Sequence, residues 1–502
     1  MSVLNFGWAE IDLTPDKKVS LAGQFAERIS EYVEKPITAT AMAVSSEEDQ
    51  MVLVSCDVVA VSWELVSAVR ERLKNNNVGL DPDKIVMSAI HTHTGPSYAS
   101  VGSVRLGNTG NDLRSILELY LPKGKKYVEK ENISNNPEIV GQVEMFDLLV
   151  ERISKVILEA WENRKAGCFT NAFGRAAVGM CRRAVYSDGS AQMWGDTNQA
   201  VFVEVEGGND SGIELLYVFD DKKKLTGIVA NLACPAQCVQ HRLFVSPDFW
   251  GEVKKLLRQY FGEDIFLLAL CGAAGDQCPV DIVRWVEPYS DVNDPNIDRK
   301  HPLKRKADPS MFDLEGMRKA GKRIAREIVD IYEEGLDDPQ EEPEFVHHVN
   351  TVQLPIRRAT LAEEEEAKKA IKDYLRDKEG DVDYIDVAKL QRYTGILFRM
   401  AEQDKYDTMD AEIHVMRLGT VAIATNPFEL FLDYGNQIKA RSHAEQTFLV
   451  QLANGCEGYL PTAKAEMGGH YSAFIPSGQV GHEGGDLLVR ETLKEINTKL
   501  FA

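Results

Sequence analysis

The sequence predicts an α/β fold in which mixed β-sheets are flanked by helices. Its 502 residues are 44% hydrophobic and 27% charged, a composition that fits a folded globular protein and excludes a disordered or collagen-like chain. Apolar runs rich in β-branched residues alternate with segments of helical periodicity. Reactive side chains follow the ends of several apolar runs, where α/β enzymes place their sites. These three observations favour one large α/β body.

The apolar runs predict the strands in chain order. The run from Met51 to Cys56 lacks polar interruption apart from one serine and indicates a buried strand. A hairpin is predicted around Gly419, between residues 413–418 and 421–425. The remaining predicted strands cover residues 85–90, 200–205, 214–219, 225–234, 265–271 and 448–452.

Helical periodicity separates these strands. Residues 64–75 place Leu65, Val66, Val69 and Leu73 on one face, which predicts an amphipathic helix. The same reasoning predicts helices over residues 147–163 and 249–260. Residues 362–404 are charged and helical, with acidic side chains placed before basic ones at i,i+4 spacing.

We expect a single catalytic domain over residues 1–502. The change of pattern near residues 165–200 marks a candidate subdomain seam. Residues 104–140, 284–312 and 337–344 are polar or proline-containing and are expected to be inserted loops. Loops of this length often cover an active site.

Charge and cysteine content limit the partners and the compartment. Lys and Arg number 57 against 78 Asp and Glu, a net charge of −21 that repels nucleic acid and anionic lipid. We expect a small-molecule substrate, no nucleic-acid partner and no stable membrane anchor, since no apolar stretch is long enough to span a bilayer. Eight scattered cysteines and no visible signal sequence favour a cytoplasmic protein, or a secreted one if a signal has been removed.

Reactive side chains follow five of the predicted strands. Ends of parallel strands meet at one edge of a sheet, so these side chains are expected to converge. The five sets are His91 and His93; Cys234, Cys238 and His241; Asp276 and Cys278; Glu429; and Tyr459.

The segment His91-Thr-His-Thr-Gly-Pro96 carries the first candidate ligands. Alternate side chains of an extended segment share a face, so both imidazoles can face one site, and imidazole is a common zinc ligand. The alternative is a pair of hydrogen-bonded histidines that brace a Gly-Pro turn. The position directly after a buried strand favours a functional role.

A loop of small residues, Gly272-Ala-Ala-Gly-Asp-Gln-Cys-Pro279, carries the second candidate set. Backbone N–H groups in such a loop can face an oxyanion, and Cys278 is presented with Asp276 two residues before it. Without further context, such a loop is more often a tight turn. Glu429 alone would be a helix N-terminal acid, and Tyr459 alone would be a rim aromatic.

Taken together, these segments resemble the neutral/alkaline, non-lysosomal ceramidase superfamily. The matching segments run in family order from the N-terminus almost to the C-terminus: Gly7-Trp-Ala-Glu-Ile-Asp-Leu-Thr-Pro15, Ala89-Ile-His-Thr-His-Thr-Gly-Pro96, Gly272-Ala-Ala-Gly-Asp-Gln-Cys-Pro279, Pro427-Phe-Glu-Leu-Phe431, Gly458-Tyr-Leu-Pro-Thr462 and Gly468-Gly-His-Tyr471. The resemblance implies one catalytic zinc per chain, with ligand roles for His91, Glu429 and Tyr459 and with His93 close by.

The sequence departs from the family pattern at three places. Where the family has a His-Pro pair, this chain reads Cys234-Pro235, so the second metal-binding histidine would be replaced by His241, Cys234, Cys238 or Gln237. The serine of the family's Gly-Asp-x-Ser-Pro motif is Cys278. The chain is also expected to lack the family's C-terminal immunoglobulin-like domain.

We expect a metal-dependent hydrolase, specifically a zinc amidohydrolase. It would cleave an amide or related carbonyl bond of an unidentified substrate other than ceramide. A divalent ion activates water for attack on a carbonyl, His93 would pass a proton to the leaving amine, and Arg183 would orient a polar substrate group. Cys278 would donate to the oxyanion, act as a nucleophile if its pKa is depressed, or bind the metal. The rival readings are a metal-free, degenerate binding protein and a metal-dependent lyase or carbohydrate-processing enzyme on the same scaffold.

Overall fold

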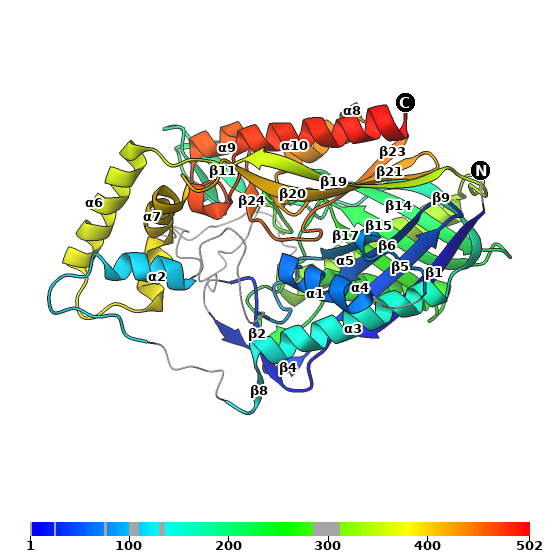
Figure 1. Cartoon of the computed structure of the whole chain (residues 1–502), viewed down its shortest axis with the longest axis horizontal. Coiled ribbons are helices and arrows are strands. Elements are labelled where there is room, and N and C mark those ends of the chain that lie inside the picture. The colour runs from blue at the N-terminus through cyan, green and yellow to red at the C-terminus, as the bar shows by residue number, and fades with distance from the viewer. Residues whose placement is uncertain (1–2, 25–26, 75–77, 100–109, 130–135, 285–311) are drawn as a thin grey trace.

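The computed structural model has four layers, two of sheet between two of helix (Figure 1). It describes residues 3–24, 27–74, 78–99, 110–129, 136–284 and 312–502. Residues 104–109 and 130–135 of the first expected insertion and residues 285–311 of the second lie outside these residues. The predicted α/β class with mixed sheets and flanking helices is confirmed.

The larger sheet has eight strands in the order β17-β15-β14-β9-β1-β5-β6-β7. Their bounds are Leu4–Asp12 (β1), Thr38–Ser45 (β5), Gln50–Cys56 (β6), Ile85–Ala89 (β7), Lys165–Arg175 (β9), Gly212–Asp220 (β14), Leu225–Leu232 (β15) and Phe266–Cys271 (β17). The pairs β6–β7 and β15–β17 are parallel, and the other pairs are antiparallel.

Strand β9 joins the two halves of this sheet. Its first residues, Lys165 to Gly167, pair with β1, whereas Gly167 to Arg175 pair with β14. The sheet therefore bends where the sequence suggested a seam near residues 165–200. Ser55 of β6 donates its hydroxyl to the carbonyl oxygen of Ala269 in β17 at 2.6 Å, so the two halves approach each other again at their far ends.

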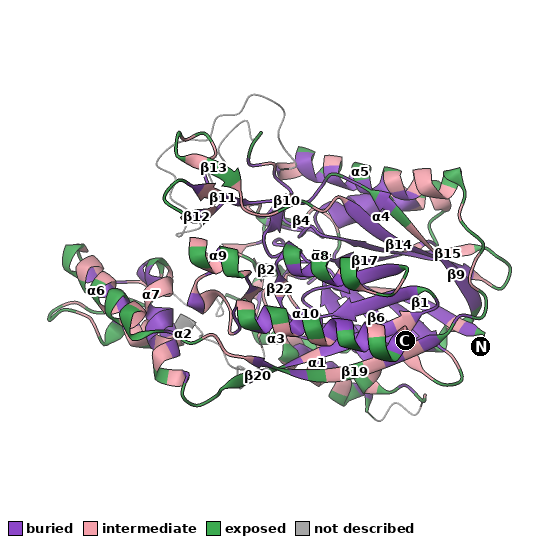
Figure 2. Cartoon of the chain, turned by 90° about the horizontal axis from the view of Figure 1, so that it is seen from above, coloured by how far each residue is buried: buried purple, intermediate pink, exposed green. Residues whose placement is uncertain are grey.

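Four helices cover the outer face of the larger sheet, two on each half (Figure 2). Trp63–Leu73 (α1) and Gln142–Glu162 (α3) cover the half that holds β1 to β7, and Phe249–Phe261 (α4) and Asp313–Glu334 (α5) cover the other half. In α1, the four apolar residues predicted to share a face, Leu65, Val66, Val69 and Leu73, are all buried.

The smaller sheet has four strands in the order β19-β20-β21-β23 and packs on the inner face of the larger one. Its strands are Phe345–Pro355 (β19), Thr408–Leu418 (β20), Val421–Thr425 (β21) and Gln446–Val450 (β23), and β21 runs parallel to β23. Apolar residues of both sheets, including Trp8, Leu268 and Phe448, form the core between them. The helices Leu432–Arg441 (α8) and His482–Lys494 (α10) cover the other face of the smaller sheet (Figure 1).

A helical lobe lies at one end of the sandwich (Figures 1 and 2). It contains Gly110–Glu118 (α2), Leu361–Asp377 (α6) and Tyr384–Glu402 (α7), which share one apolar cluster. The charged helical segment predicted over 362–404 is two helices, because Gly380 adopts a positive φ and Asp383 caps α7 with a capping box.

The remaining elements are short. The short strands are Lys18–Leu21 (β2), Arg28–Ile29 (β3), Tyr32–Val33 (β4), Ile139–Val140 (β8), Met180–Cys181 (β10), Arg183–Tyr186 (β11), Ala191–Met193 (β12), Phe202–Val205 (β13), Phe244–Val245 (β16), Gln277–Cys278 (β18), Glu429–Leu430 (β22) and Tyr459–Leu460 (β24). The short helices are Pro82–Lys84, Ala463–Gly468 (α9), Ile475–Ser477 and Glu495–Leu500. Among the described residues, no helix combines the length and the apolar character needed to cross a bilayer.

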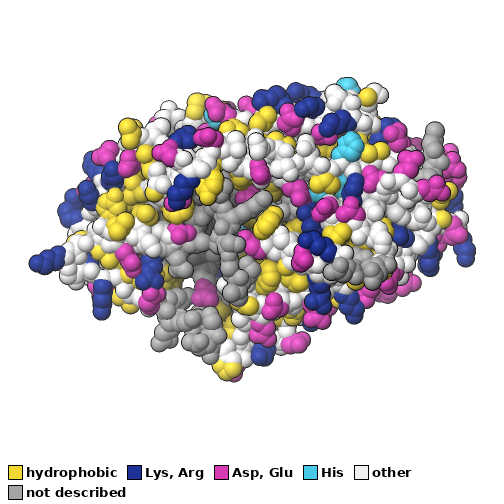
Figure 3. All heavy atoms as spheres, in the orientation of Figure 1, with side chains coloured by type: hydrophobic (Ala, Val, Ile, Leu, Met, Phe, Trp, Pro, Cys, Tyr) yellow, Lys and Arg dark blue, Asp and Glu magenta, His cyan; other side chains and the backbone are white. Residues whose placement is uncertain are grey.

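The face seen in Figure 3 carries acidic and basic side chains interspersed, without a broad patch of either sign.

The single catalytic domain, the small-molecule substrate and the compartment stay predictions.

Candidate functional site

The five predicted junctions meet beside the core between the two sheets. The strands that precede them, β7, β15, β17, β21 and β23, each have a parallel neighbour. Gln451 links three of the junctions, because its side-chain oxygen accepts hydrogen bonds from the backbone N–H groups of Ala274 and Leu430, both at 3.0 Å. The backbone N–H of Ala236 donates to the carbonyl of Ile90 at 3.2 Å, which joins the other two.

His91 begins the site, directly after β7. Its φ of 64° lies in the left-handed region, an uncommon conformation for a residue with a side chain. Its Nδ1 lies 2.6 Å from the carbonyl oxygen of Val59, which can only accept, so Nδ1 carries the proton. The lone pair of Nε2 is therefore free, and this atom lies 3.5 Å from a carboxylate oxygen of Glu429.

Glu429 and Tyr459 are placed by a two-residue parallel pair. Strands β22 and β24 pair Glu429 directly with Tyr459, and the backbone N–H of Glu429 donates to the carbonyl of Gly458 at 2.9 Å. The two side chains are hydrogen-bonded to each other. Burial, together with the negative charge of Glu429, raises the pKa of the Tyr459 phenol well above its ordinary value.

His93 lies beside His91, with the two ring centroids 4.8 Å apart and nearly perpendicular. Burial lowers the pKa of His93 well below its usual range, and the positive charges of Arg28 and Arg182 lower it further, so the ring is neutral. Its Nε2 lies 3.4 Å from the amide nitrogen of Gln237. Gln237, one of the four proposed replacements for the second histidine, thus contacts His93.

The other three proposed replacements have different surroundings. His241 lies 3.5 Å from the Asp313 carboxylate, and its ring stacks on Phe312. The Cys234 thiol donates to the carbonyl of Pro235 at 3.5 Å. Burial raises the pKa of both Cys234 and Cys238 well above the usual value, the same direction as for Tyr459.

Arg182 lies at the centre of the site, where the sequence suggested Arg183. Nη1 of Arg182 donates to Oε1 of Gln237 at 3.1 Å, and Nη2 donates to the carbonyl of Gly275 at 3.1 Å. The guanidinium lies within electrostatic range of Tyr459, Tyr471, Cys278 and Glu429.

Arg183 makes a different set of contacts. It is fully buried, binds both carboxylate oxygens of Glu206 at 2.7 and 2.9 Å, and donates to the carbonyl of Gly469 at 2.9 Å. Successive side chains of an extended segment point to opposite faces, so only one of two adjacent arginines can face the site. The sequence pattern does not show which.

The small-residue loop, residues 272–279, lies against Arg182. Asp276 accepts from the backbone N–H of Leu432 at 2.9 Å through its carboxylate, and from that of Arg182 at 3.0 Å through its carbonyl. Burial raises the pKa of Asp276 to about 6. The Cys278 thiol donates to the carbonyl of Val280 at 3.3 Å, and burial raises its pKa to about 12, although Arg182 opposes this. The condition set for a nucleophilic Cys278, a depressed pKa, is therefore not met.

The donor set can be compared with what a metal ion requires. Within the described residues, no three His, Cys, Asp or Glu side chains gather into a metal-binding group. The candidate set combines one imidazole, one carboxylate and the phenol of Tyr459. Two ligand atoms on a tetrahedral zinc lie about 3.4 Å apart, close to the 3.5 Å between His91 Nε2 and the Glu429 oxygen. The spacing of His91 and Glu429 is therefore compatible with two ligands on one ion.

A cavity of about 160 Å³ opens onto Tyr459. It is bordered by Gln391, Arg392, Tyr459, Tyr471, Phe474, Pro476 and Ser477, so α7 of the helical lobe forms one wall. A second hollow of about 400 Å³ shares Arg392 and Phe474 with it.

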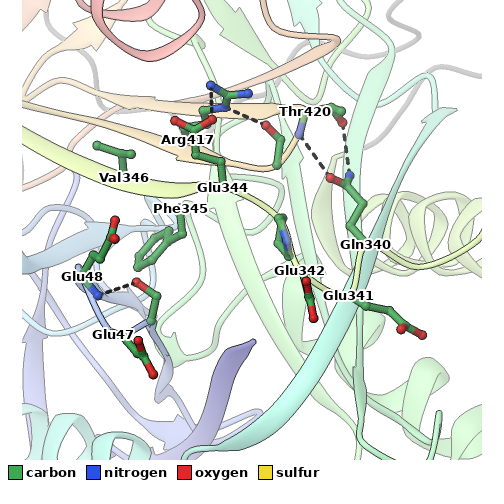
Figure 4. A pocket seen from close by; sticks show the side chains of 13 residues that line it. Glu47, Glu48, Gln340, Glu341, Glu342, Glu344, Phe345, Val346, Arg417 and Thr420 are labelled. Carbon is green, nitrogen blue, oxygen red and sulfur yellow. Dashed lines mark hydrogen bonds and ion pairs between the residues drawn. The ribbon is translucent and has the colours of Figure 1, made fainter. Parts of the chain in front are cut away.

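A larger pocket, of about 720 Å³, lies elsewhere, beside the start of β19 (Figure 4). It is lined by five glutamates, at 47, 48, 341, 342 and 344, and by none of the predicted site residues. Arg417 pairs with Glu344 at 2.7 Å, and Gln340 bonds to Thr420 at 3.2 Å. This pocket is a solvated acidic surface.

Comparison with known proteins shows the fold. Neutral ceramidase from Pseudomonas aeruginosa matches with a TM-score of 0.65 and 16% identity, over 99% of this chain and 75% of that protein. A ceramidase complexed with C2 matches with a TM-score of 0.63 and 14% identity, over 100% of this chain and 76% of that one. No protein-family model and no curated protein sequence matches the chain. The chain therefore has the neutral ceramidase fold, and the predicted resemblance is confirmed at the level of the fold.

Proposed function

We propose that the chain is a metal-dependent hydrolase that cleaves an amide or related carbonyl bond of a small substrate other than ceramide. The observation that carries the proposal is the orientation of His91, whose Nδ1 is held by Val59 while Nε2 faces the carboxylate of Glu429. A histidine fixed in this way by a backbone carbonyl is typical of metal ligands. The fold of the two ceramidases supports the same reaction class.

We assign the metal to His91, Glu429 and Tyr459, with zinc as the expected ion at about one per chain. When bound there, a divalent ion supplies Lewis-acid polarisation of a carbonyl and lowers the pKa of water. Gln237 and Arg182 occupy the region where the second family histidine was expected, and they hold a neutral amide beside His93.

The chain's own residues divide the remaining work. His93 is a neutral base that lies beside His91; it would accept a proton from the attacking water and then pass that proton to the leaving amine. The guanidinium of Arg182, rather than that of Arg183, would bind a polar group of the substrate or a developing oxyanion. The N–H groups of the 272–279 loop and the Cys278 thiol would add further donors, and Asp276 holds that loop against Leu432.

One rival has an observation in its favour. The absence of a three-residue His, Cys, Asp or Glu cluster among the described residues suits a protein that has kept the fold and lost the metal. Metal content separates this rival from the proposed enzyme.

The test is elemental analysis of protein purified without chelator, followed by a substrate panel. We expect about one zinc-like ion per chain, strongly reduced in His91→Ala and Glu429→Ala, and unchanged in a control that replaces the exposed His443 with Ala. The panel compares a long-chain ceramide in detergent with short N-acyl amino acids, N-acyl sugars and simple esters. If metal content is the same in all four proteins, the assigned site is wrong; efficient ceramide turnover that His91→Ala abolishes would overturn the substrate assignment.

A further inference from the structure

Arg392 of α7 lines the cavity that opens onto Tyr459. Among the described residues that line the 160 Å³ cavity, it alone carries a formal charge, and the others are aromatic, apolar or neutral polar. Tyr459, a proposed metal ligand, lines the same cavity. A cation at this place is unexpected in a chain with a net charge of −21.

The guanidinium of Arg392 is held in place but is only weakly paired. It lies 4.3 Å from the ring centroid of Phe474 and 5.3 Å from that of Tyr393, which fix its plane through cation–π contacts. Its ion pair with Glu366 is long, at 3.4 Å, and joins side chains that are 36% and 59% exposed. Among the described residues, its buried Nε has no hydrogen-bond partner.

These features suit the recognition of a carboxylate. A guanidinium offers parallel N–H donors that match the two oxygens of a carboxylate, and the side chain of Arg392 is 36% exposed. Tyr471 and Phe474 border the cavity and offer aromatic surface beside the cation. At about 160 Å³ the cavity is smaller than the drug-sized sites of about 300–1,000 Å³, which favours a small ligand.

We infer that Arg392 is a specificity-determining residue that binds a carboxylate on the substrate. The substrate class is then a short N-acyl amino acid or another small amide that carries a carboxylate. The inference rests on the proposed function in one respect: that the bond cleaved in the substrate is an amide. Recognition of the carboxylate itself can be measured without turnover.

The experiment measures binding of hippurate and of its neutral analogue hippuramide by calorimetry, using chelator-treated protein. Wild type is expected to bind hippurate at least about 10-fold more tightly than hippuramide. Arg392→Met should remove that preference, and Arg392→Lys should leave it intermediate, because lysine keeps the charge and loses the paired donors. The control, Lys389→Met, removes the same charge from an exposed position on the same helix and should change nothing.

Two results would overturn the inference: equal binding of both probes by wild type, or no binding of hippurate at about 10 mM. Equal loss of preference in Lys389→Met would also overturn it, since the effect would then be one of net charge. With turnover, Arg392→Met should raise KM for the acid and leave kcat nearly unchanged. Charge-selective binding without any hydrolysis would defeat the proposed reaction and leave the carboxylate site standing.

Discussion

Arg182 and Gln237 act as one unit in this structure, because Nη1 of the arginine donates to Oε1 of the glutamine and so turns the amide nitrogen toward His93. Both side chains are buried, with 3% and 1% of their surface exposed, so neither is free to adopt another rotamer without disturbing the other. The pair thus presents an amide nitrogen to His93.

The first prediction concerns this pair. Arg182→Lys and Gln237→Leu should each lower kcat by about 10–100-fold, because each change removes the hydrogen bond that orients the amide. The double variant should be little worse than the worse single variant, as is usual for residues that act together. Steady-state kinetics on all four proteins checks this; fully additive losses would show that the two residues act separately.

The adjacent arginine should behave differently. Arg183→Met leaves the Glu206 carboxylate buried without its partner, so the free energy of unfolding should fall by about 3–5 kcal/mol. Urea unfolding measures the loss, and Glu206→Gln in the same chain should recover part of it. A variant of wild-type stability and reduced activity would return Arg183 to the catalytic role that the sequence suggested.

Gly23 supports His93 from behind. A Cβ at Gly23 would lie 2.6 Å from the His93 ring, and Gly23 has a φ of 89°. Gly23→Ala should therefore displace the imidazole and lower kcat by about 100-fold. Gly79→Ala is the matched control, because Gly79 has a φ of 77° and nothing within 4 Å of the added atom. An equal fall of kcat in both variants would mean that backbone strain, and not the position of His93, decides the effect. A wild-type kcat in Gly23→Ala would contradict the prediction.

Cys278 should be an unreactive thiol. Because burial raises its pKa to about 12, it should resist iodoacetamide at pH 8 in the folded protein and react only after denaturation, when all eight cysteines are accessible. Cys278→Ala should keep kcat within about 10-fold of wild type. Peptide mapping by mass spectrometry gives the modification, and rapid labelling in the native state would restore the nucleophile hypothesis.

Stability should depend on pH through a buried histidine pair between the two sheets. His347 Nε2 lies 2.8 Å from His414 Nδ1, and His414 Nε2 lies 2.9 Å from Glu412, which Arg70 also binds. Burial lowers the pKa of both imidazoles. The unfolded chain therefore binds more protons below its pKa of about 6.5, so stability is full above that pH and is lost as the pH falls.

The measurement is the free energy of unfolding in urea between about pH 7.5 and 6. Wild type should lose up to about 1.4 kcal/mol per pH unit for each neutral histidine once the pH is below 6.5. The double variant His347→Gln, His414→Gln should have a flatter profile, and the exposed-site control His443→Gln should match wild type. Identical slopes in the wild-type and the double-variant proteins would contradict the prediction.

Much of the fold could be predicted because β6 and β7 are continuous apolar runs. Strand β5, in contrast, reads Thr-Ala-Thr-Ala-Met-Ala-Val-Ser, in which small alanines replace most of the large apolar residues that mark a strand, yet it is buried by layers on both faces. Strand β9 contains Gly167 and Gly174, which pack where a Cβ would meet Phe219 and Ile331. Their identity as strands comes from their neighbours and not from their own pattern.

Some residues of the candidate site could likewise be predicted from the sequence, and others could not. His91, His93, Glu429 and Tyr459 follow strand ends within recognisable motifs, and the structure brings them together. Gln237 is one of four candidates that the sequence leaves open, and Arg182 is not among the candidates, since which of two adjacent arginines faces the site depends on which face of an extended segment meets the junction of two sheets. The position of Arg392 depends on how the helical lobe packs, which no local pattern contains.

The residues of the proposed metal site come from two different sheets, and this affects when the site can form during folding. His91 follows a strand of the eight-stranded sheet, whereas Glu429 and Tyr459 follow strands of the four-stranded sheet, and most of the chain separates them in sequence. Contacts this distant form late, after loop closure has been completed and the sheets have docked. The intact ligand set would thus exist only in the finished molecule, and newly made chains would remain unable to capture the ion until the last packing step.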